Sequence, residues 1–149
     1  AITPCSIVTF APIFTKMGSE LIVTRSVLAA LIEAAAGAAP KEACGLLLGA
    51  GGTIDEARPC ANLAADPQRF FELDPAALIA AHRAERSGGA ILLGYYHSHP
   101  SGLAQPSAED QRQASGDGKV WAIVAGREVR FWRDGPQGFV ALSYALSDG

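Results

Sequence analysis

Two histidines that stand one residue apart are the part of this chain best suited to chemistry. His97 and His99 lie in the stretch GYYHSHPSGLAQPSAED (94–110), and the whole chain contains only 3 histidines. Alternate side chains of a β-strand project from the same face, so these imidazoles would point the same way with Cα atoms about 6.6 Å apart. Two such imidazoles suit zinc, which takes nitrogen ligands together with a carboxylate and keeps one position open in catalytic sites.

A serine and an acid follow the histidines after a short loop. Ser107 and Asp110 come after PSGLAQP, a segment that two prolines and a glycine mark as loop. Taken alone, a serine with an acid three residues later indicates a capping box at the start of a helix, which is a common structural feature. The nearby histidines favour a metal-ligand role for Asp110. Both interpretations are compatible, because Ser107 can cap the helix while its first turn delivers Asp110 to the ion.

Together these residues resemble the JAMM motif of the JAB1/MPN/Mov34 zinc metallopeptidases. That motif consists of an upstream Glu, then HxHP, six residues, Ser, two residues and Asp. The chain has HSHP at 97–100, then SGLAQP, Ser107, two residues and Asp110. The upstream glutamate would be Glu42 in PKEACGLLLG, where, as in the family, a Glu opens an apolar strand. The resemblance extends from about Leu21 to the last predicted strands and is to the small free-standing prokaryotic type.

The resemblance implies a role for each of the five motif residues. One zinc ion would be held by His97, His99 and Asp110. Glu42 would take a proton from the attacking water, and Ser107 would help to hold the developing oxyanion. Zinc polarises a carbonyl and lowers the pKa of water to about 7, and a positioned acid or base contributes roughly 10² to 10⁴ in rate. The implied fold is α/β, a single-domain mixed β-sheet flanked by helices with JAB1/MPN-like (cytidine-deaminase-like) architecture.

Several of these residue types also have simpler explanations. Without the resemblance, Glu42 would be interpreted as a solvated residue before a strand. His82 lies inside a predicted helix and is expected to be structural or on the surface, and Glu109 is expected to be a surface charge. Cys44 would share the face of Glu42 and lie near the metal, or it is a small core residue. Four aromatic residues are expected to pack in or beside the sheet: Tyr95, Tyr96, Trp121 and Trp132.

The elements that must position these residues follow from apolar patterning and turn residues. Strands are predicted at 20–24, 43–49, 53–60, 69–73, 90–99, 119–125, 128–134 and 138–146. One helix would be capped by Thr24 or Ser26 and stopped by Gly37. A second would begin at Asp74 and Pro75, and a short third helix would follow Ser107. The result is a layered α/β domain with adjacent antiparallel strands near its end.

Composition and charge narrow the classes of partner. Apolar residues make up 49% of the chain and charged residues 18%, which allows one packed core in a chain of 149 residues. Lys and Arg number 12 against 15 Asp and Glu without any basic run, so nucleic acid is not expected as a partner. Cys5, Cys44 and Cys60 contain no CxxC pair, which favours reduced thiols in a cytoplasmic protein and excludes a cysteine-rich zinc site.

The N-terminal stretch AITPCSIVTFAPIFTK lacks the features of a signal or a membrane span. It has no basic leader, and Pro4, Pro12 and Lys16 interrupt it, so neither export nor membrane insertion is expected. Residues 1–16 are interpreted as an N-terminal extension or a segment added for expression, and residues 17–149 as the metallopeptidase domain.

The resemblance implies zinc-dependent hydrolysis of a peptide or isopeptide bond without a covalent intermediate. Known members of the family cleave after the C-terminal Gly-Gly of ubiquitin or ubiquitin-like proteins, and small prokaryotic relatives act on sulfur-carrier homologues. A partner with a glycine-ended tail is implied, since glycine lets a backbone enter a narrow groove. Two alternatives stay open: a non-catalytic scaffold of the same fold, and a zinc-dependent deaminase, whose HxE and PCxxC pattern is missing. The particular substrate and the oligomeric state do not follow from the sequence.

Overall fold

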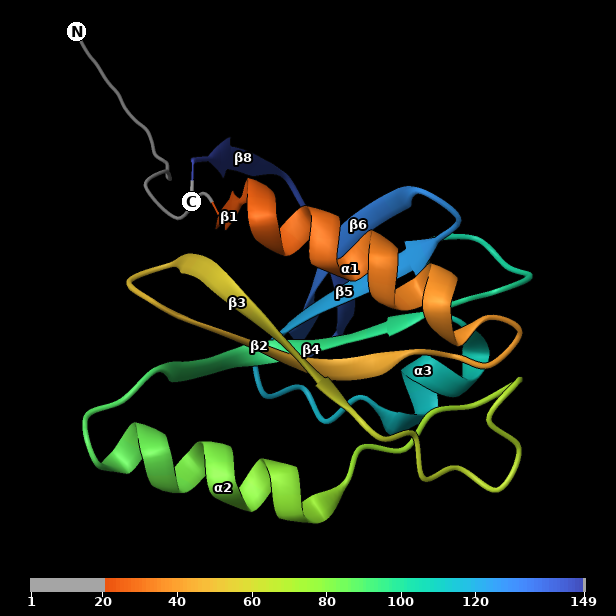
Figure 1. Cartoon of the computed structure of the whole chain (residues 1–149), viewed down its shortest axis with the longest axis horizontal. Helices are drawn as coiled ribbons and strands as arrows, with labels where there is room; N and C mark the ends of the chain where they lie inside the picture. The colour runs from red at the N-terminus through yellow and green to blue at the C-terminus, as the bar shows by residue number, and fades with distance from the viewer. Residues whose placement is uncertain (1–20, 149) are drawn as a thin grey trace, which may run out of the picture.

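The chain folds into alternating strands and helices over residues 21–148, the part that this computed structural model describes. The strands are β1 (Leu21–Thr24), β2 (Cys44–Ala50), β3 (Thr53–Cys60), β4 (Ile91–Ser98), β5 (Val120–Ala125), β6 (Glu128–Gly135), β7 (Gly138–Leu142) and β8 (Tyr144–Ser147). The helices are α1 (Arg25–Ala38), α2 (Pro75–Arg86) and α3 (Ala108–Gln113). The strands form one mixed sheet in the order β7-β6-β5-β4-β2-β3-β1-β8 (Figure 1). The extension predicted for residues 1–16 lies outside the described residues.

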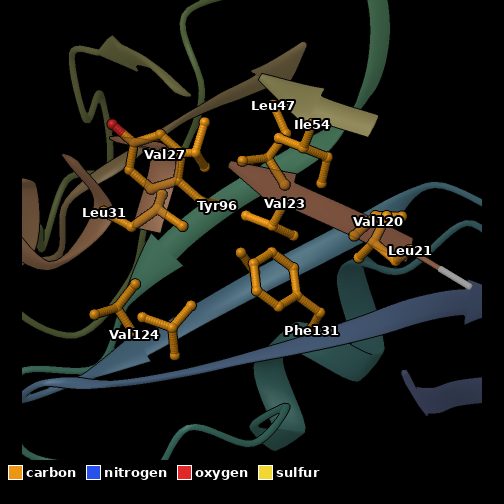
Figure 2. Close-up of a cluster of buried hydrophobic side chains, with 12 residues drawn as sticks. Leu21, Val23, Val27, Leu31, Leu47, Ile54, Tyr96, Val120, Val124 and Phe131 are labelled. Carbon is orange, nitrogen blue, oxygen red and sulfur yellow. The ribbon is translucent and has the colours of Figure 1, made fainter. Parts of the chain in front are cut away.

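Helices α1 and α2 cover opposite faces of this sheet (Figure 1). The larger core lies under α1 and is entirely apolar apart from one tyrosine hydroxyl (Figure 2). Its buried members are Leu21, Val23, Val27, Leu31, Leu47, Ile54, Tyr96, Val120, Ala122, Val124, Val129 and Phe131. The smaller cluster under α2 consists of Leu46, Leu48, Ala81 and Leu92. Successive residues of β2 alternate between the two clusters, as expected for a strand that is buried on both faces.

Strand β4, which carries the first histidine, contains a bulge. Its pairing with β2 skips Leu93, so this position is an extra residue in β4. A bulge changes the face to which later side chains point. Leu92 before the bulge and Tyr95 after it therefore both pack on the α2 side, although they are three positions apart. His97 consequently faces the α2 side, and Tyr96 enters the core under α1.

Most of the predicted elements are confirmed, and their caps agree with the sequence. Thr24 accepts a hydrogen bond from the Val27 amide at 3.2 Å and begins α1, and Asp74 caps α2 with Pro75 in the first turn. Gly37 does not end α1, because a helical glycine costs only about 1 kcal/mol and the helix continues to Ala38. Within residues 21–148 no helix has the length and apolar character needed to cross a membrane.

Two predicted strands were wrong. Residues 69–73 form a loop with a single bridge between Asn62 and Leu73, because the Asn62 side chain, and not a neighbouring strand, bonds this backbone. The segment 138–146 is two strands separated at Ser143, and the second strand pairs in parallel with β1 at the other edge of the sheet. Apolar alternation does not reveal such a break, since both halves keep the period of a strand.

Candidate functional site

Three potential ligand atoms converge where β4 ends. His97 lies in β4 and is fully buried, and His99 follows the strand. The Nε2 atoms of the two imidazoles are 3.1 Å apart. Asp110 Oδ2 lies 3.1 Å from His97 Nε2 and 3.2 Å from His99 Nε2. The structure therefore brings together the three predicted metal ligands.

The spacing of these atoms fits a small tetrahedral cation. With metal–ligand bonds of about 2.0 Å, tetrahedral geometry places neighbouring ligand atoms about 3.3 Å apart. The three observed separations of 3.1 to 3.2 Å form a nearly equilateral triangle of this size. Two nitrogens and one carboxylate oxygen are also the ligand types that zinc accepts at catalytic sites. The residues present thus fit a zinc ion with its fourth position open.

Asp110 is oriented by the capping box of α3, as the sequence predicted. The Asp110 amide donates to Ser107 Oγ at 3.0 Å, and the Ser107 amide donates to Asp110 Oδ2 at 2.9 Å. The same Oδ2 atom faces the histidines. Burial raises the pKa of Asp110, but hydrogen bonds from His97, His99 and Ser107 outweigh burial and hold the pKa well below its usual range. The carboxyl group is therefore ionised and suited to a cation.

The two imidazoles are held in different ways. His99 Nδ1 lies 2.6 Å from the Leu103 carbonyl oxygen, which can only accept, so Nδ1 carries a proton and Nε2 is the nitrogen that would bind a cation. Burial lowers the pKa of His99, but hydrogen bonds with Asp110 and Leu103 outweigh burial and raise it overall. Burial lowers the pKa of His97, and its buried Nδ1 has no hydrogen-bond partner within residues 21–148.

Glu42 precedes β2 and belongs to a part of the sequence that is far from the two histidines. Its backbone amide donates to the Pro67 carbonyl at 2.7 Å, and its carbonyl accepts from Asn62 Nδ2 at 3.1 Å. The next residue, Ala43, donates its amide to Ser98 Oγ at 2.8 Å and so ties this segment to the end of β4. The backbone of Glu42 is consequently fixed from two directions.

Glu42 is almost buried, with 7% of the residue's surface exposed. Burial raises the pKa of this carboxyl from 4.5 to about 7, with His99 lowering it and Asp110 raising it to smaller extents. A carboxyl group that titrates near neutrality can accept and return a proton at physiological pH. Its environment therefore matches the base role that the motif implies.

Glu42 and His99 open onto a cleft of about 440 Å³. The cleft is bounded by the loop between β3 and α2 (residues 61–74, here the Asn62 loop) and by the loop after β4 (residues 99–107, here the ligand loop). Its lining residues are Glu42, Gln68, Arg69, His99, Pro100, Ser101, Gly102, Leu103, Gln105, Pro106 and Ser107. All predicted site residues except the buried His97 and Asp110 reach this surface.

The other candidate residues from the sequence add no ligand atom to the cluster of His97, His99 and Asp110. His82 is exposed on α2, and Glu109 pairs with Arg112 on the surface of α3. Cys44 is paired with His97 in the β2–β4 register, but its Sγ lies near the Cys60 and Ala61 carbonyls. Burial raises the pKa of the Cys44 thiol to about 12, so it stays protonated at neutral pH.

Three residues around the site were not anticipated from the sequence. Phe71 stacks on the His97 ring with centroids 4.2 Å apart, and Trp121 meets the same ring edge-on at 5.6 Å. Asn62 contributes the hydrogen bond to the Glu42 carbonyl. Trp121 was assigned only to the core or its flanks, and the Asn62 loop carries no periodic pattern that could indicate these contacts.

The architecture closely resembles a solved prokaryotic protein. The solution structure of protein DSY2949 from Desulfitobacterium hafniense superposes with a TM-score of 0.75 at 29% identity, over 87% of this chain and 94% of that one. Fold and site together define a mixed α/β domain with a candidate three-ligand metal centre at the end of a central strand. Residues 24–135 match the family of prokaryotic homologues of the JAB domain, and the chain belongs to this family.

Curated relatives of the chain carry peptidase names. The desampylase of Haloferax volcanii is 41% identical over 102 residues, which is 67% of this chain and 73% of the relative. The probable TtuB-protein conjugate cleaving protease of Thermus thermophilus is 36% identical over 102 residues, which is 68% of this chain and 63% of the relative. The chain thus spans about two thirds to three quarters of these relatives.

Proposed function

We propose that this protein is a zinc-dependent peptidase that hydrolyses a peptide or isopeptide bond after the Gly-Gly tail of a ubiquitin-like or sulfur-carrier protein. The observation that carries the proposal is the triangle of His97, His99 and Asp110 ligand atoms, with sides of 3.1 to 3.2 Å, whose member His99 lines the same cleft as Glu42. Membership of the JAB family and the peptidase names of the relatives support it.

The chemistry divides between the ion and the residues of the chain. Zinc, when bound by the three ligands, supplies a Lewis acid that polarises the scissile carbonyl and acidifies water. Glu42 takes the proton of the attacking water and passes it to the leaving amine as the C–N bond breaks. The raised pKa of Glu42, about 7, suits both transfers at neutral pH.

Ser107 stabilises the oxyanion that develops on the scissile carbonyl. Its Oγ accepts the Asp110 amide, which leaves the hydroxyl hydrogen free to donate into the cleft that Ser107 lines. A donor aimed at the developing oxyanion is worth on the order of 3 kcal/mol. Capping α3 and holding the oxyanion use different atoms of the hydroxyl group, so both roles fit one residue.

The cleft and the relatives together support the substrate class. One relative is named a desampylase, and the name of the other describes cleavage of a TtuB-protein conjugate. A tail that ends in glycines presents backbone without side chains, which suits a cleft bounded by two loops. A ubiquitin-like or sulfur-carrier protein with such a tail is therefore the proposed partner.

Incubation with candidate ubiquitin-like fusions from the same genome, read by intact mass, tests the proposal. Cleavage after the terminal glycine is expected with zinc and should stop after chelation. Glu42→Gln should retain zinc and lose roughly 10² to 10⁴ in rate, because only the proton transfer is removed. Glu128→Gln, an exposed acid in β6, serves as the matched control. Unchanged turnover of Glu42→Gln would reject the assignment of the base.

A further inference from the structure

His97 is the least conventionally supported of the three ligands. A ligating histidine usually donates its other ring nitrogen to an oxygen, which fixes the ring orientation. His99 does so through Leu103, but His97 Nδ1 is buried and has no hydrogen-bond partner among the described residues. Rotation about the Cβ–ring bond of histidine is soft. Another contact must therefore hold the imidazole plane.

Phe71 supplies this contact by packing. Its ring lies parallel to the His97 imidazole, with an interplanar angle of 16° and centroids 4.2 Å apart. Trp121 closes the edge of the imidazole at an angle of 87°. Any large rotation of the imidazole would drive it into one of these two rings, since buried side chains are closely packed.

Phe71 can hold a ring only if its own backbone is fixed, although it belongs to a loop. Asn62 provides that restraint. Its Nδ2 donates to the Phe70 carbonyl at 3.0 Å, and its Oδ1 accepts the Glu72 amide at 3.1 Å. The Asn62 amide group thus bonds the backbone on both sides of Phe71.

The same amide group reaches the base. Asn62 Nδ2 also donates to the Glu42 carbonyl at 3.1 Å, and the Glu42 amide donates to Pro67 within the same loop. One side chain therefore contacts both the backbone of the predicted base and the segment that carries the ring stacked on a predicted ligand.

We infer that the Asn62 loop is the positioning element of the site, in which Phe71 sets the plane of the His97 imidazole and Asn62 sets the Glu42 backbone. This inference rests on the proposed function and deepens it. Neither residue lines the cleft or belongs to the three potential ligands. They act through His97 and Glu42, so zinc affinity and turnover should respond together to the loop.

The first test measures zinc affinity by competition with a chromophoric chelator, independently of any substrate. Phe71→Leu and Phe71→Met keep an apolar side chain but lose the flat stacking surface, and zinc Kd should rise about 10- to 100-fold. Phe71→Tyr should restore Kd to within about threefold of the wild type, because it restores the ring. Leu78→Ala, a half-buried residue of α2 that packs against the smaller cluster, is the control and should leave Kd unchanged.

The second test separates positioning from simple loss of fold. Asn62→Asp keeps the acceptor oxygen and removes every Nδ2 bond, so kcat should fall at least about tenfold with KM nearly unchanged and with weaker zinc binding. Leu63→Ala, at the exposed neighbouring position, is its control. Thermal melts confirm that the compared variants are folded.

The outcomes discriminate between the two proposals. A wild-type protein that binds no zinc and cleaves no fusion removes the proposed function. A wild-type protein that binds zinc and turns over, with Phe71→Met and Asn62→Asp matching it in Kd and kcat, removes only the inference about the Asn62 loop. If Phe71→Leu fails to fold, Phe71→Met and Asn62→Asp decide the matter by the same two measurements.

Discussion

The two sides of the cleft are built by different means. On the ligand side, His97, His99 and Asp110 come from one stretch of the sequence and contact one another directly. On the opposite side, Glu42 lies far upstream, contributes none of the three ligand atoms, and is held through its backbone by the Asn62 loop. On the ligand side, polar side-chain atoms gather around one point. On the base side, hydrogen bonds to the Asn62 loop hold the backbone of Glu42.

This difference predicts different responses to the metal. Three electron-rich ligand atoms within 3.1 to 3.2 Å of one another gain most when a cation lies between them. The bonds of the Asn62 loop to Glu42 and to its own backbone pair protein donors with protein acceptors. The base side should therefore be preorganised, whereas the ligand side should be completed by the metal.

The largest effect is expected from a ligand. Asp110→Asn keeps an oxygen acceptor for the Ser107 amide but removes the negative charge, so zinc Kd should rise by more than about 100-fold and turnover should be lost. Zinc content and cleavage of a Gly-Gly fusion measure both. Glu109→Gln, the adjacent acid on α3, should change neither, and a zinc-loaded, active Asp110→Asn variant would contradict the ligand assignment.

Ser107→Ala should have the next largest effect, because Ser107 belongs to the ligand loop but binds no metal. Removing an oxyanion donor should lower kcat by roughly 10² to 10³, and loss of the cap should cost about 1 kcal/mol in the free energy of unfolding. Ser107→Thr should recover the cap. Ser101→Ala removes another serine hydroxyl that lines the cleft; an equal loss of kcat there would count against a specific role for Ser107.

A smaller effect concerns stability and pH on the base side. Burial raises the pKa of Glu42 from 4.5 to about 7 in the folded protein. The stability that the protonated carboxyl group contributes is therefore fully present below about pH 4.5 and is lost as the pH rises through about 7. In metal-free protein at pH 8, Glu42→Gln should therefore be more stable by on the order of 2 kcal/mol. Urea unfolding at pH 4 and pH 8 measures this, and a pH-independent difference would show that Glu42 is not desolvated.

The smallest expected effect tests most directly whether the ligand side and the base side depend differently on the metal. Chelation should reduce amide-exchange protection in residues 99–110 by about tenfold, since ligand binding stabilises only what it contacts. Protection in the Asn62 loop should change much less. Hydrogen exchange read by mass spectrometry on both segments of one sample provides the internal control. Equal loss of protection in both would indicate that the base side also depends on the metal.

The sequence predicted the ligand side well for a physical reason. The spacing of the two histidines and the capping box at Ser107 are local patterns, so the sequence alone favoured a metal-ligand role for Asp110, and the full set of three ligands followed from the resemblance to the family. Glu42 was reached only through a resemblance to a family, because its position depends on contacts with residues that are distant in sequence. The burial that raises its pKa becomes visible only in the folded chain.

The base side also contains what the sequence could not show. Residues 69–73 have the composition of a strand, yet Asn62 bonds their backbone and keeps Phe71 against His97. A single asparagine in a polar loop does not indicate, from the sequence, that its side chain makes five hydrogen bonds. The separation of β7 from β8 was missed for a similar reason, because the partner of β8 is β1, at the opposite end of the chain.

The extra residue at Leu93 decides which face of the sheet the imidazole occupies. Side chains of a strand point alternately to the two faces, so one additional residue inverts the phase of everything that follows unless a bulge absorbs it. A strand of the present length that paired regularly through Leu93 would turn His97 toward the interior where Tyr96 now lies. Deleting Leu93 would instead restore an unbroken pleat and leave His97 opposite Cys44, so the bulge is what allows the longer strand to keep the imidazole at the site.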